Sequence, residues 1–396
     1  IPYGFPLGLP FVVCTLLFLI VSKRKVQINY NIELMIFYLA ILSYLWGLLL
    51  NDNSLYINNI KDLKNILTII FMSIILALLS KNEFKDFLLI LLRLVSFTSF
   101  FVSIFALIKY QMLINGKELE FLIVGENKYP RGTSLIIDYN MFSYSLFFGI
   151  IASFIELKLT KNIYYKLFLV TNLIFLLITI LLAGSRRAWV ILILLFLITF
   201  IFSIKLIKKQ LHKKSTIIFF VIIVGLVSLF SFRIISDTGT NREIERLKYR
   251  FSTIQEGGFS ERTNRWIHAK NIYINEYTLS EKIFGSGFDY LMIFAEVNSF
   301  KIKEDYPHNP ILSALLYSGI LGFILSIVIL LLPFVLINEM NRVYKYEMLT
   351  LYIISLMYIL ISGNSIFSNK LFLCYLLIIL FSAVQHKRQK TLLIKL

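Results

Sequence analysis

The chain has 396 residues, of which 58% are hydrophobic and only 16% charged, and its mean hydropathy is +0.78. A soluble globular domain is nearer half apolar and a quarter charged, so this composition excludes an ordinary soluble protein. In a soluble chain the net charge of +17 would suggest nucleic-acid binding. Here nineteen of the forty basic residues lie in short loops between apolar blocks and in the C-terminal tail, where they set membrane topology, and we expect no nucleic-acid partner.

The apolar residues fall into blocks of roughly 16 to 25 residues, the length at which a helix crosses about 30 Å of hydrocarbon. Because backbone polar groups in lipid must be satisfied within the segment, these blocks are predicted to be helices. The predicted fold class is an all-α polytopic membrane protein with eleven spans. The predicted spans are residues 4–21, 32–50, 64–80, 87–108, 135–156, 164–183, 188–204, 216–232, 309–336, 348–362 and 366–384.

The chain begins with Ile1 in place of Met and runs at once into an apolar stretch interrupted by Pro2, Pro6 and Pro10. We therefore expect a fragment whose natural start, and with it a first span, is missing, which would make twelve spans. A cleaved signal peptide would leave the same beginning.

The distribution of basic residues between alternate loops predicts the orientation, because cytoplasmic loops carry the excess of Lys and Arg. One set of alternate loops, with the C-terminal tail, holds nineteen basic residues, and the opposite short loops hold nine. We therefore place the C-terminus in the cytoplasm. The predicted domains are an N-terminal transmembrane bundle of about eight spans (1–232), a large extracytoplasmic, periplasmic loop (233–307), and C-terminal helices of about three spans with a cytoplasmic tail (308–396).

The large loop holds eleven further Lys and Arg residues that topology does not explain. They are Arg233, Arg242, Arg246, Lys248, Arg250, Arg262, Arg265, Lys270, Lys282, Lys301 and Lys303. The positive-inside rule leaves the outer side of a membrane protein poor in Lys and Arg. Basic residues gathered there therefore predict an anionic partner on the outer face.

The sequence offers few residues for metal or cofactor chemistry. Cys14 and Cys374 both lie inside apolar spans, so neither a disulfide framework nor a thiolate metal site is available. The chain also contains no HExxH motif, no Walker loop and no dinucleotide-binding glycine pattern. We therefore expect chemistry without a metal ion and without a cofactor.

Residues 183–189, Ala-Gly-Ser-Arg-Arg-Ala-Trp, form the first of three motifs on the predicted outer face. One apolar block ends there and another begins almost at once, so Arg186 and Arg187 lie in a hairpin too short to leave the membrane surface. A guanidinium at that depth is costly unless it is paired or hydrated, and Arg can bind phosphate oxygens bidentately. The alternative is interfacial anchoring, with Trp189 in the aromatic belt.

Residues 261–270 follow a Gly-Gly break and are predicted to form a helix in the large loop. Arg262, Arg265 and Trp266 fall on one face of that helix. Such a face could lie against the bilayer and meet a lipid-borne phosphate. The alternative is a solvated amphipathic helix. His268, on the same helix, is a lesser candidate for a catalytic histidine.

Residues 306–310, Tyr-Pro-His-Asn-Pro, mark the point where the large loop re-enters the membrane. Asn309 is predicted to cap a transmembrane helix and Pro310 suits its first position. His308 then lies beside the positive end of the helix, which disfavours imidazolium and keeps the ring able to accept a proton. The same helix end can attract phosphate. The alternative is a histidine that only completes the cap.

These motifs, in this order, resemble the O-antigen ligase/polymerase superfamily. The resemblance rests on Gly-Ser-Arg-Arg-Ala-Trp at 184–189, on Arg265-Trp266, and on the run that begins Pro-His-Asn-Pro at 307. The motifs that carry the resemblance lie between residues 128 and 323. It implies a fold similar to GT-C-type glycosyltransferases, with twelve spans and one large periplasmic loop, in the bacterial inner membrane. It also implies metal-independent transfer of a glycan from undecaprenyl diphosphate to an acceptor sugar.

The resemblance also assigns roles to particular residues. It places the family's first functional arginine on Arg186, beside Arg187, and the second on Arg265, with Arg262 as a nearby rival. It places the catalytic histidine on His308. In the implied mechanism the arginines neutralise the diphosphate while the histidine deprotonates the acceptor hydroxyl.

A weaker match concerns an earlier outer-loop segment of the family. Arg131-Gly132, followed by Asp138 and Asn140, resembles that segment, and Asn309 is a secondary candidate beside the histidine. The chain departs from the family pattern at its start, where eleven spans stand in place of twelve.

Two acceptors remain open under this resemblance. A polymerase transfers the glycan to another lipid-linked repeat, and a ligase transfers it to the lipid A-core. We favour the polymerase, because the richness in Ile, Lys, Asn, Phe and Tyr suggests an AT-rich gene of the kind found in polysaccharide clusters. The implied partners are the undecaprenyl-diphosphate-linked oligosaccharide donor, the glycan or lipid A-core acceptor, the lipid bilayer, and other polysaccharide-assembly membrane proteins.

The alternatives from other classes are a lipid-linked oligosaccharide flippase, which also has many spans and basic charge, and a non-catalytic assembly protein. Transporters commonly show paired repeats and intramembrane charges near the midplane. Here Arg93 is the only clear charge well inside a predicted span, and it lies close enough to the inner face to snorkel.

Overall fold

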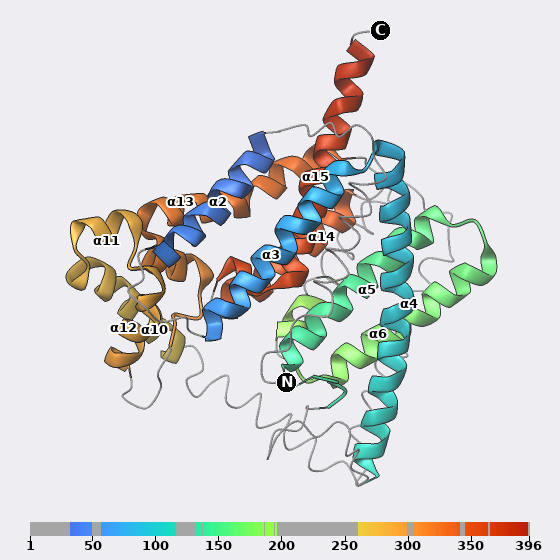
Figure 1. Cartoon of the computed structure of the whole chain (residues 1–396). Coiled ribbons are helices and arrows are strands. Elements are labelled where there is room, and N and C mark those ends of the chain that lie inside the picture. The colour runs from blue at the N-terminus through green and yellow to red at the C-terminus, as the bar shows by residue number, and fades with distance from the viewer. Residues whose placement is uncertain are drawn as a thin grey trace, which may run out of the picture. The chain divides into compact units, whose positions relative to one another are not determined.

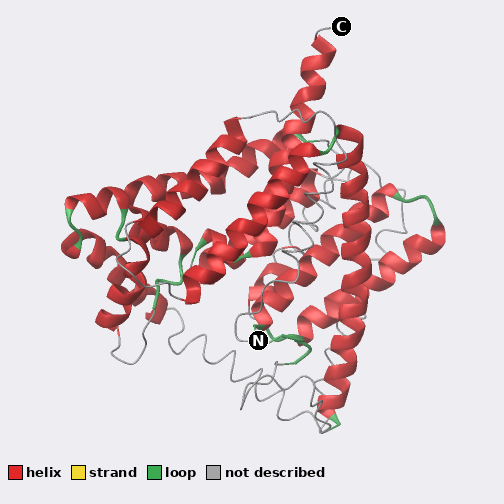
Figure 2. Cartoon of the chain, in the orientation of Figure 1, coloured by secondary structure: helices red, strands yellow, loops and turns green. Residues whose placement is uncertain are grey.

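The structure is a computed structural model that describes residues 32–49, 57–115, 132–136, 138–185, 187–193, 195, 260–298, 305–340, 345–362 and 365–394. Within these ranges every regular element is a helix and no strand occurs (Figures 1 and 2). The predicted all-α fold class is therefore confirmed for the described part of the chain.

Four helices in the described ranges are long and apolar enough to cross a membrane. They are Asn82–Met112, Tyr139–Leu159, Ile163–Leu182 and Pro310–Asn338. Each overlaps a predicted span, and the shorter apolar helices Ile32–Leu45 and Lys370–Ala383 overlap two more. The predicted spans 4–21 and 216–232 lie outside the described residues, so the count of eleven spans and the orientation stay predictions.

The chain divides into two compact units. The first unit combines Ile1–Leu88 with Phe259–Leu396, and the second consists of Leu89–Gly258. The first unit thus joins the described end of the predicted large loop to helices from both ends of the chain. The predicted domain boundaries at residues 232 and 307 stay a prediction.

The long helices of the first unit are α2, α3, α13, α14 and α15. Their bounds are Ile32–Leu49, Ile57–Leu78, Pro310–Glu339, Lys345–Ser362 and Lys370–Ile394. The shorter elements are α10 (Ser260–Asn271), η3 (Ile272–Glu276), α11 (Leu279–Phe284), η4 (Gly287–Asp289), α12 (Tyr290–Asn298) and η5 (Ile366–Ser368). Helix α13 is central, because it packs against α2, α10, α11, α14 and α15. In Figure 1 the short helices α10 to α12 gather beside α2 and α13.

A break in α13 lets the short helices approach it closely. Gly319 has φ 63°, a left-handed conformation inside the helix, and Gly285 at the end of α11 has φ 84°. A Cβ on Gly285 would lie 2.3 Å from the Tyr317 carbonyl carbon, and one on Gly319 would lie 2.4 Å from that of Ile283. Only residues without a side chain allow this contact between two backbones.

Hydrogen bonds at the break attach the short helices α10 to α12, here called the loop helices, to α13. The Leu316 carbonyl accepts from the backbone N–H of Ser286 at 3.0 Å and from the Tyr277 hydroxyl at 3.1 Å. The Tyr277 and Ser286 hydroxyl oxygens are 2.5 Å apart. Burial raises the pKa of the Tyr277 hydroxyl well above its usual value, so the group remains a neutral donor.

A buried carboxylate joins α2, α3 and the connection before α15. Asp62 Oδ2 accepts hydrogen bonds from the hydroxyls of Tyr44 and Ser365, each at 2.6 Å. One turn later Asn65 donates to the Phe367 carbonyl at 2.9 Å. The rings in contact with Tyr44 are those of Phe288, Tyr317 and Phe367. Because a buried carboxylate is costly without such donors, these contacts fix how the helix ends meet.

The second unit contains α4 (Lys81–Ile114) from Leu89 onward, α5 (Tyr139–Leu159) and α6 (Ile163–Leu182). Asp138 and Asn162 cap α5 and α6 through their side chains. Asn172 on α6 donates to the Ser96 carbonyl and to the Ser153 hydroxyl, both at 3.0 Å, and so ties together all three helices.

Helix α4 exposes a continuous apolar stripe. Its members are Ile90, Leu94, Phe97, Phe101, Phe105 and Ile108. Their spacing of three and four residues places them on one face of the helix. Such a face on a helix of this length fits contact with lipid. Arg93, on the same helix, is 65% exposed, and its Nε lies 4.0 Å from the buried Glu156 carboxylate.

We expect Gly285→Ala to lower the stability of the first unit by roughly 1–3 kcal/mol, because the new Cβ meets the backbone of α13 and the positive φ is strained. Thermal unfolding in detergent should show a lower midpoint. The matched variant is Ile320→Ala, which truncates a half-exposed side chain next to the break and should shift the midpoint less. Equal midpoints for Gly285→Ala and wild type would contradict the close approach.

Candidate functional site

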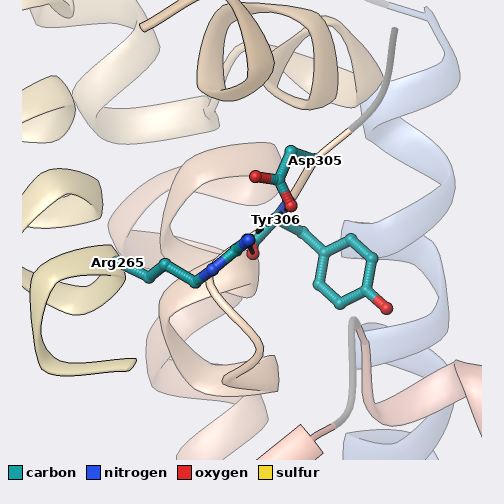
Figure 3. Close-up of polar contacts among 3 residues, drawn as sticks. All are labelled: Arg265, Asp305 and Tyr306. Carbon is teal, nitrogen blue, oxygen red and sulfur yellow. Dashed lines mark hydrogen bonds and ion pairs between the residues drawn. The ribbon is translucent and has the colours of Figure 1, made fainter. Parts of the chain in front are cut away.

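Helix α10 carries Arg265 and confirms the helix predicted at residues 261–270. The Arg265 guanidinium is turned toward the segment that leads into α13 (Figure 3). Its Nη1 donates to Asp305 Oδ1 at 2.5 Å and to the Tyr306 carbonyl at 3.2 Å. The two side chains of the ion pair are only 16% and 10% exposed. The pair is thus well shielded from solvent, which strengthens the attraction between its charges.

Asp305 is held from a second side. Its backbone N–H donates to the Leu291 carbonyl on α12 at 3.1 Å, and its Oδ1 also accepts from the Tyr306 N–H at 2.9 Å. Segment 305–306 therefore lies between α10 and α12, fixed by side-chain and backbone hydrogen bonds together.

His308 follows in an unusual backbone conformation. Its φ is 55°, and it is the only non-glycine residue with positive φ among those that the structure describes. Such conformations cost of order 1–3 kcal/mol and persist only where the surroundings enforce them, often at functional sites. The Tyr306 ring meets the imidazole edge to face, with centroids 4.5 Å apart.

The predicted cap of α13 is confirmed. Asn309 accepts hydrogen bonds from the N–H groups of Ile311 at 3.0 Å and Leu312 at 3.3 Å, and Pro310 takes the first helical position. His308 therefore lies directly before the positive end of a 30-residue helix. A neutral imidazole in this place can accept a proton, and the helix end favours an anion nearby.

The remaining candidates on α10 have other surroundings. Arg262 is half-buried. The His268 ring packs edge to face on Phe294 of α12, with centroids 4.9 Å apart. The buried His268 Nε2 and Trp266 Nε1 have no hydrogen-bond partner among the described residues. His268 thus belongs to the contact between α10 and α12, and the predicted approach of this face to the bilayer stays a prediction.

In the second unit, the predicted hairpin and the earlier outer-loop segment meet. The Ser185 hydroxyl donates to Asn140 Oδ1 at 2.8 Å and accepts from the Ala188 N–H at 3.3 Å. The Trp189 indole N–H donates to the Leu181 carbonyl at 3.1 Å. Arg187 is half-buried in the helical turn that begins there. Arg186 lies outside the described residues.

The segment before Asn140 packs on the end of α6. The Thr133 hydroxyl donates to the Thr179 carbonyl at 2.7 Å, and a Cβ on Gly132 would lie 2.0 Å from the Leu182 carbonyl oxygen. Lys109, only 3% exposed, donates from its ammonium group to the Ser134 carbonyl. Arg131 lies outside the described residues.

Within each unit, the structure therefore brings one set of candidate residues together. The first unit joins Arg265 to the segment before His308, and the second joins Asn140 to the hairpin that contains Arg187. The predicted meeting of Arg186 with Arg265 and His308 stays a prediction. Sequence reasoning missed Asp305 and Lys109. The available signal for Asp305 was the acidic pair Glu304-Asp305 just before the Tyr-Pro-His-Asn-Pro motif, after Lys301 and Lys303.

The described residues contain no group of three or more His, Cys, Asp or Glu side chains that could hold a metal ion. The groups that the described motifs offer for substrate chemistry include cations, hydroxyls, amides and a histidine at a helix end. Such an arrangement can bind an anionic group and accept a proton.

A comparison with protein families identifies residues 171–327 as matching the family described as O-Antigen ligase. The matched region contains the hairpin at 183–189, helix α10, and the segment from Asp305 into α13. No curated protein matches the chain. The resemblance to the O-antigen ligase/polymerase superfamily is thus confirmed. The family and the apolar helices together support a multi-pass membrane protein of the glycosyltransferase type, in the context of lipid-linked glycans and the bilayer.

We expect the Ser185–Asn140 contact to couple the hairpin to α5. Replacing either residue by Ala should lower stability by about 1 kcal/mol, and the double variant should lose less than the sum, with a coupling of 0.5 kcal/mol or more. Thermal unfolding of the three variants in detergent measures this.

The matched control for this cycle is Ser145→Ala. Among the described residues, the Ser145 hydroxyl donates only to the Phe142 carbonyl, in the same helix. Combined with Asn140→Ala it should give an additive loss. Strict additivity in the Ser185 cycle would instead show that the contact carries no stability.

Proposed function

We propose that this chain is a membrane glycosyltransferase that moves a glycan from undecaprenyl diphosphate to an acceptor sugar hydroxyl at the outer face of the bacterial inner membrane. The observation that carries the proposal is the contact of Arg265 with the segment directly before His308. Both residues lie inside the region that matches the O-antigen ligase family. A cation for the diphosphate and a base for the acceptor thus belong to one described arrangement.

The arginines act on the leaving group. Arg265 from α10, together with Arg186 from the hairpin, neutralises the diphosphate of the donor. Negative charge grows on the diphosphate oxygen as its bond to the anomeric carbon breaks, and a guanidinium already in place stabilises that charge without reorganising. Arg187 and Arg262 lie beside these two in the sequence and add positive charge at the same face, and Arg131 is a further candidate.

His308 acts on the acceptor. The imidazole takes the proton of the acceptor hydroxyl while its oxygen forms the new bond to the anomeric carbon, and undecaprenyl diphosphate leaves. This single displacement inverts the anomeric configuration. The helix end behind Asn309 supports the role, because it disfavours a charged imidazolium before the reaction. The reaction needs no metal ion, since the chain's own cations serve the leaving group.

The acceptor distinguishes two enzymes with the same chemistry. Our first candidate is the polymerase, in which the acceptor is a second lipid-linked repeat unit. The second candidate is a ligase, in which the acceptor is the lipid A-core, and the description of the matched family favours it. Glycan analysis of a deletion strain separates them. Loss of long chains, with one repeat still on the core, indicates the polymerase, and intact chains stranded on the carrier indicate the ligase.

The proposed topology has eleven spans in this chain, or twelve with a further N-terminal span, and a cytoplasmic C-terminus. It puts α10 to α12 on the outer face, where the lipid-linked donor is presented. The competing role is a flippase. Incubation of the purified protein with an undecaprenyl-diphosphate oligosaccharide in detergent, with and without a core acceptor, separates enzyme from flippase, because no membrane is left to cross. Release of undecaprenyl diphosphate supports the proposal, and an unchanged donor contradicts it.

We expect His308→Asn to lower the transfer rate about 10²–10⁴-fold, the usual contribution of a general base. Asn tolerates the positive φ at this position, so the variant keeps the backbone and removes only the base. Release of undecaprenyl diphosphate measures the rate. Thermal unfolding and retention of the labelled donor check that fold and binding persist. Wild-type turnover in this variant would end the assignment of His308 as the base.

A further inference from the structure

We propose that Asp305 is a positioning residue for the transfer, which sets the Arg265 guanidinium and the His308 segment in fixed relation to one another. This inference rests on the proposed function and adds a residue to it. Asp305 belongs to none of the motifs that identify the family resemblance above. Its role follows from three contacts in the described structure, with α10, α12 and the Tyr306 backbone.

Asp305 is the anchored member of the ion pair. Its backbone N–H is bound to the Leu291 carbonyl, and its carboxylate oxygen accepts from the Tyr306 N–H. Arg265 by contrast reaches the pair through a long side chain with several rotatable bonds. When a flexible cation meets an anchored anion, the anion determines where the cation comes to rest. Asp305 therefore selects one position of the guanidinium from the many that the side chain can reach.

Tyr306 connects the ion pair to His308. Arg265 also donates to the Tyr306 carbonyl, and the Tyr306 ring lies against the imidazole with centroids 4.5 Å apart. On the other side, Asn309 binds the first N–H groups of α13. The left-handed conformation of His308 is thus fixed from both sides, by the ion pair before it in the chain and by the helix cap after it.

The placement of the guanidinium has a consequence for catalysis. A cation that must reorient during bond breaking stabilises the leaving group less than one that is already fixed. Small displacements of catalytic groups lower the rate by up to about 10²-fold. Asp305 should therefore act on kcat, whereas attraction of the anionic donor, which depends on the arginine charge itself, should depend on Asp305 much less.

The test compares Asp305→Asn, Asp305→Glu and Glu276→Gln in the purified full chain, with an undecaprenyl-diphosphate oligosaccharide as donor. We expect Asp305→Asn to lower kcat roughly 10- to 100-fold while KM for the donor changes less than about threefold. Asp305→Glu keeps the charge and should recover part of the rate. Glu276→Gln makes the same chemical change at an exposed carboxylate on η3 and should match wild type.

A charge exchange tests whether the Arg265 guanidinium acts on the donor or only pairs with Asp305 to stabilise the fold. In the double variant Arg265→Asp with Asp305→Arg, the ion pair can form again with its charges exchanged. If the pair only stabilises the fold, the exchange restores turnover together with the unfolding midpoint, and the proposal is overturned. If the Arg265 guanidinium contacts the donor, turnover stays low even where the midpoint recovers, and the Asp305→Asn and Asp305→Glu comparison then decides whether Asp305 positions it. Should the exchanged protein fail to fold, the Asp305→Asn and Asp305→Glu comparison decides.

The outcomes also distinguish this inference from the proposed function. Wild-type protein that releases no undecaprenyl diphosphate would defeat the proposed function, and the inference with it. Active wild type with an unchanged kcat in Asp305→Asn would overturn the inference alone. The result that supports it is a lowered kcat with a nearly unchanged KM, measured below the unfolding midpoint of the variant.

Discussion

A largely buried guanidinium needs an anion beside it, and this requirement organises the segment of the first unit that leads into α13. Leaving Arg265 without Asp305 would leave a largely buried charge uncompensated, which destabilises a fold. The two residues are forty positions apart in the chain, so satisfying the pair forces α10 and the segment before α13 together. His308 lies three residues beyond Asp305. The ion pair of Arg265 with Asp305 thus places the proposed base as well as the proposed phosphate ligand.

The same constraint recurs at three other buried charges in the described helices. Asp62 is held by two hydroxyls, Lys109 by a backbone carbonyl, and Glu156 by the Tyr165 hydroxyl at 2.8 Å and by Arg93 at 4.0 Å. In surroundings this apolar, a polar group that lacks a partner costs more than it would near water. These few polar contacts therefore decide how the helix ends meet, whereas the apolar faces could pack in several ways.

The break in α13 extends this arrangement into the predicted loop. Because Gly285 and Gly319 carry no side chains, the turn after α11 can lie directly on α13, where Ser286 and Tyr277 bind the Leu316 carbonyl. The loop helices are thus attached to the same helix whose first residues follow His308. The segment around His308 and the apolar helices therefore pack as one body in this unit, so a change in the packing of α11 should also affect the proposed base.

The sequence by itself determined the features that depend on local pattern. Apolar blocks predicted the long helices, and Asn309-Pro310 predicted the start of α13, since a cap is formed by neighbours in the chain. The order of three short motifs indicated the superfamily. The tertiary structure alone revealed the partner of Arg265, the left-handed His308 and the break at Gly319. An ion pair across forty residues leaves no periodic signal, a backbone conformation depends on the contacts around it, and an uninterrupted apolar run does not reveal where a second backbone will approach.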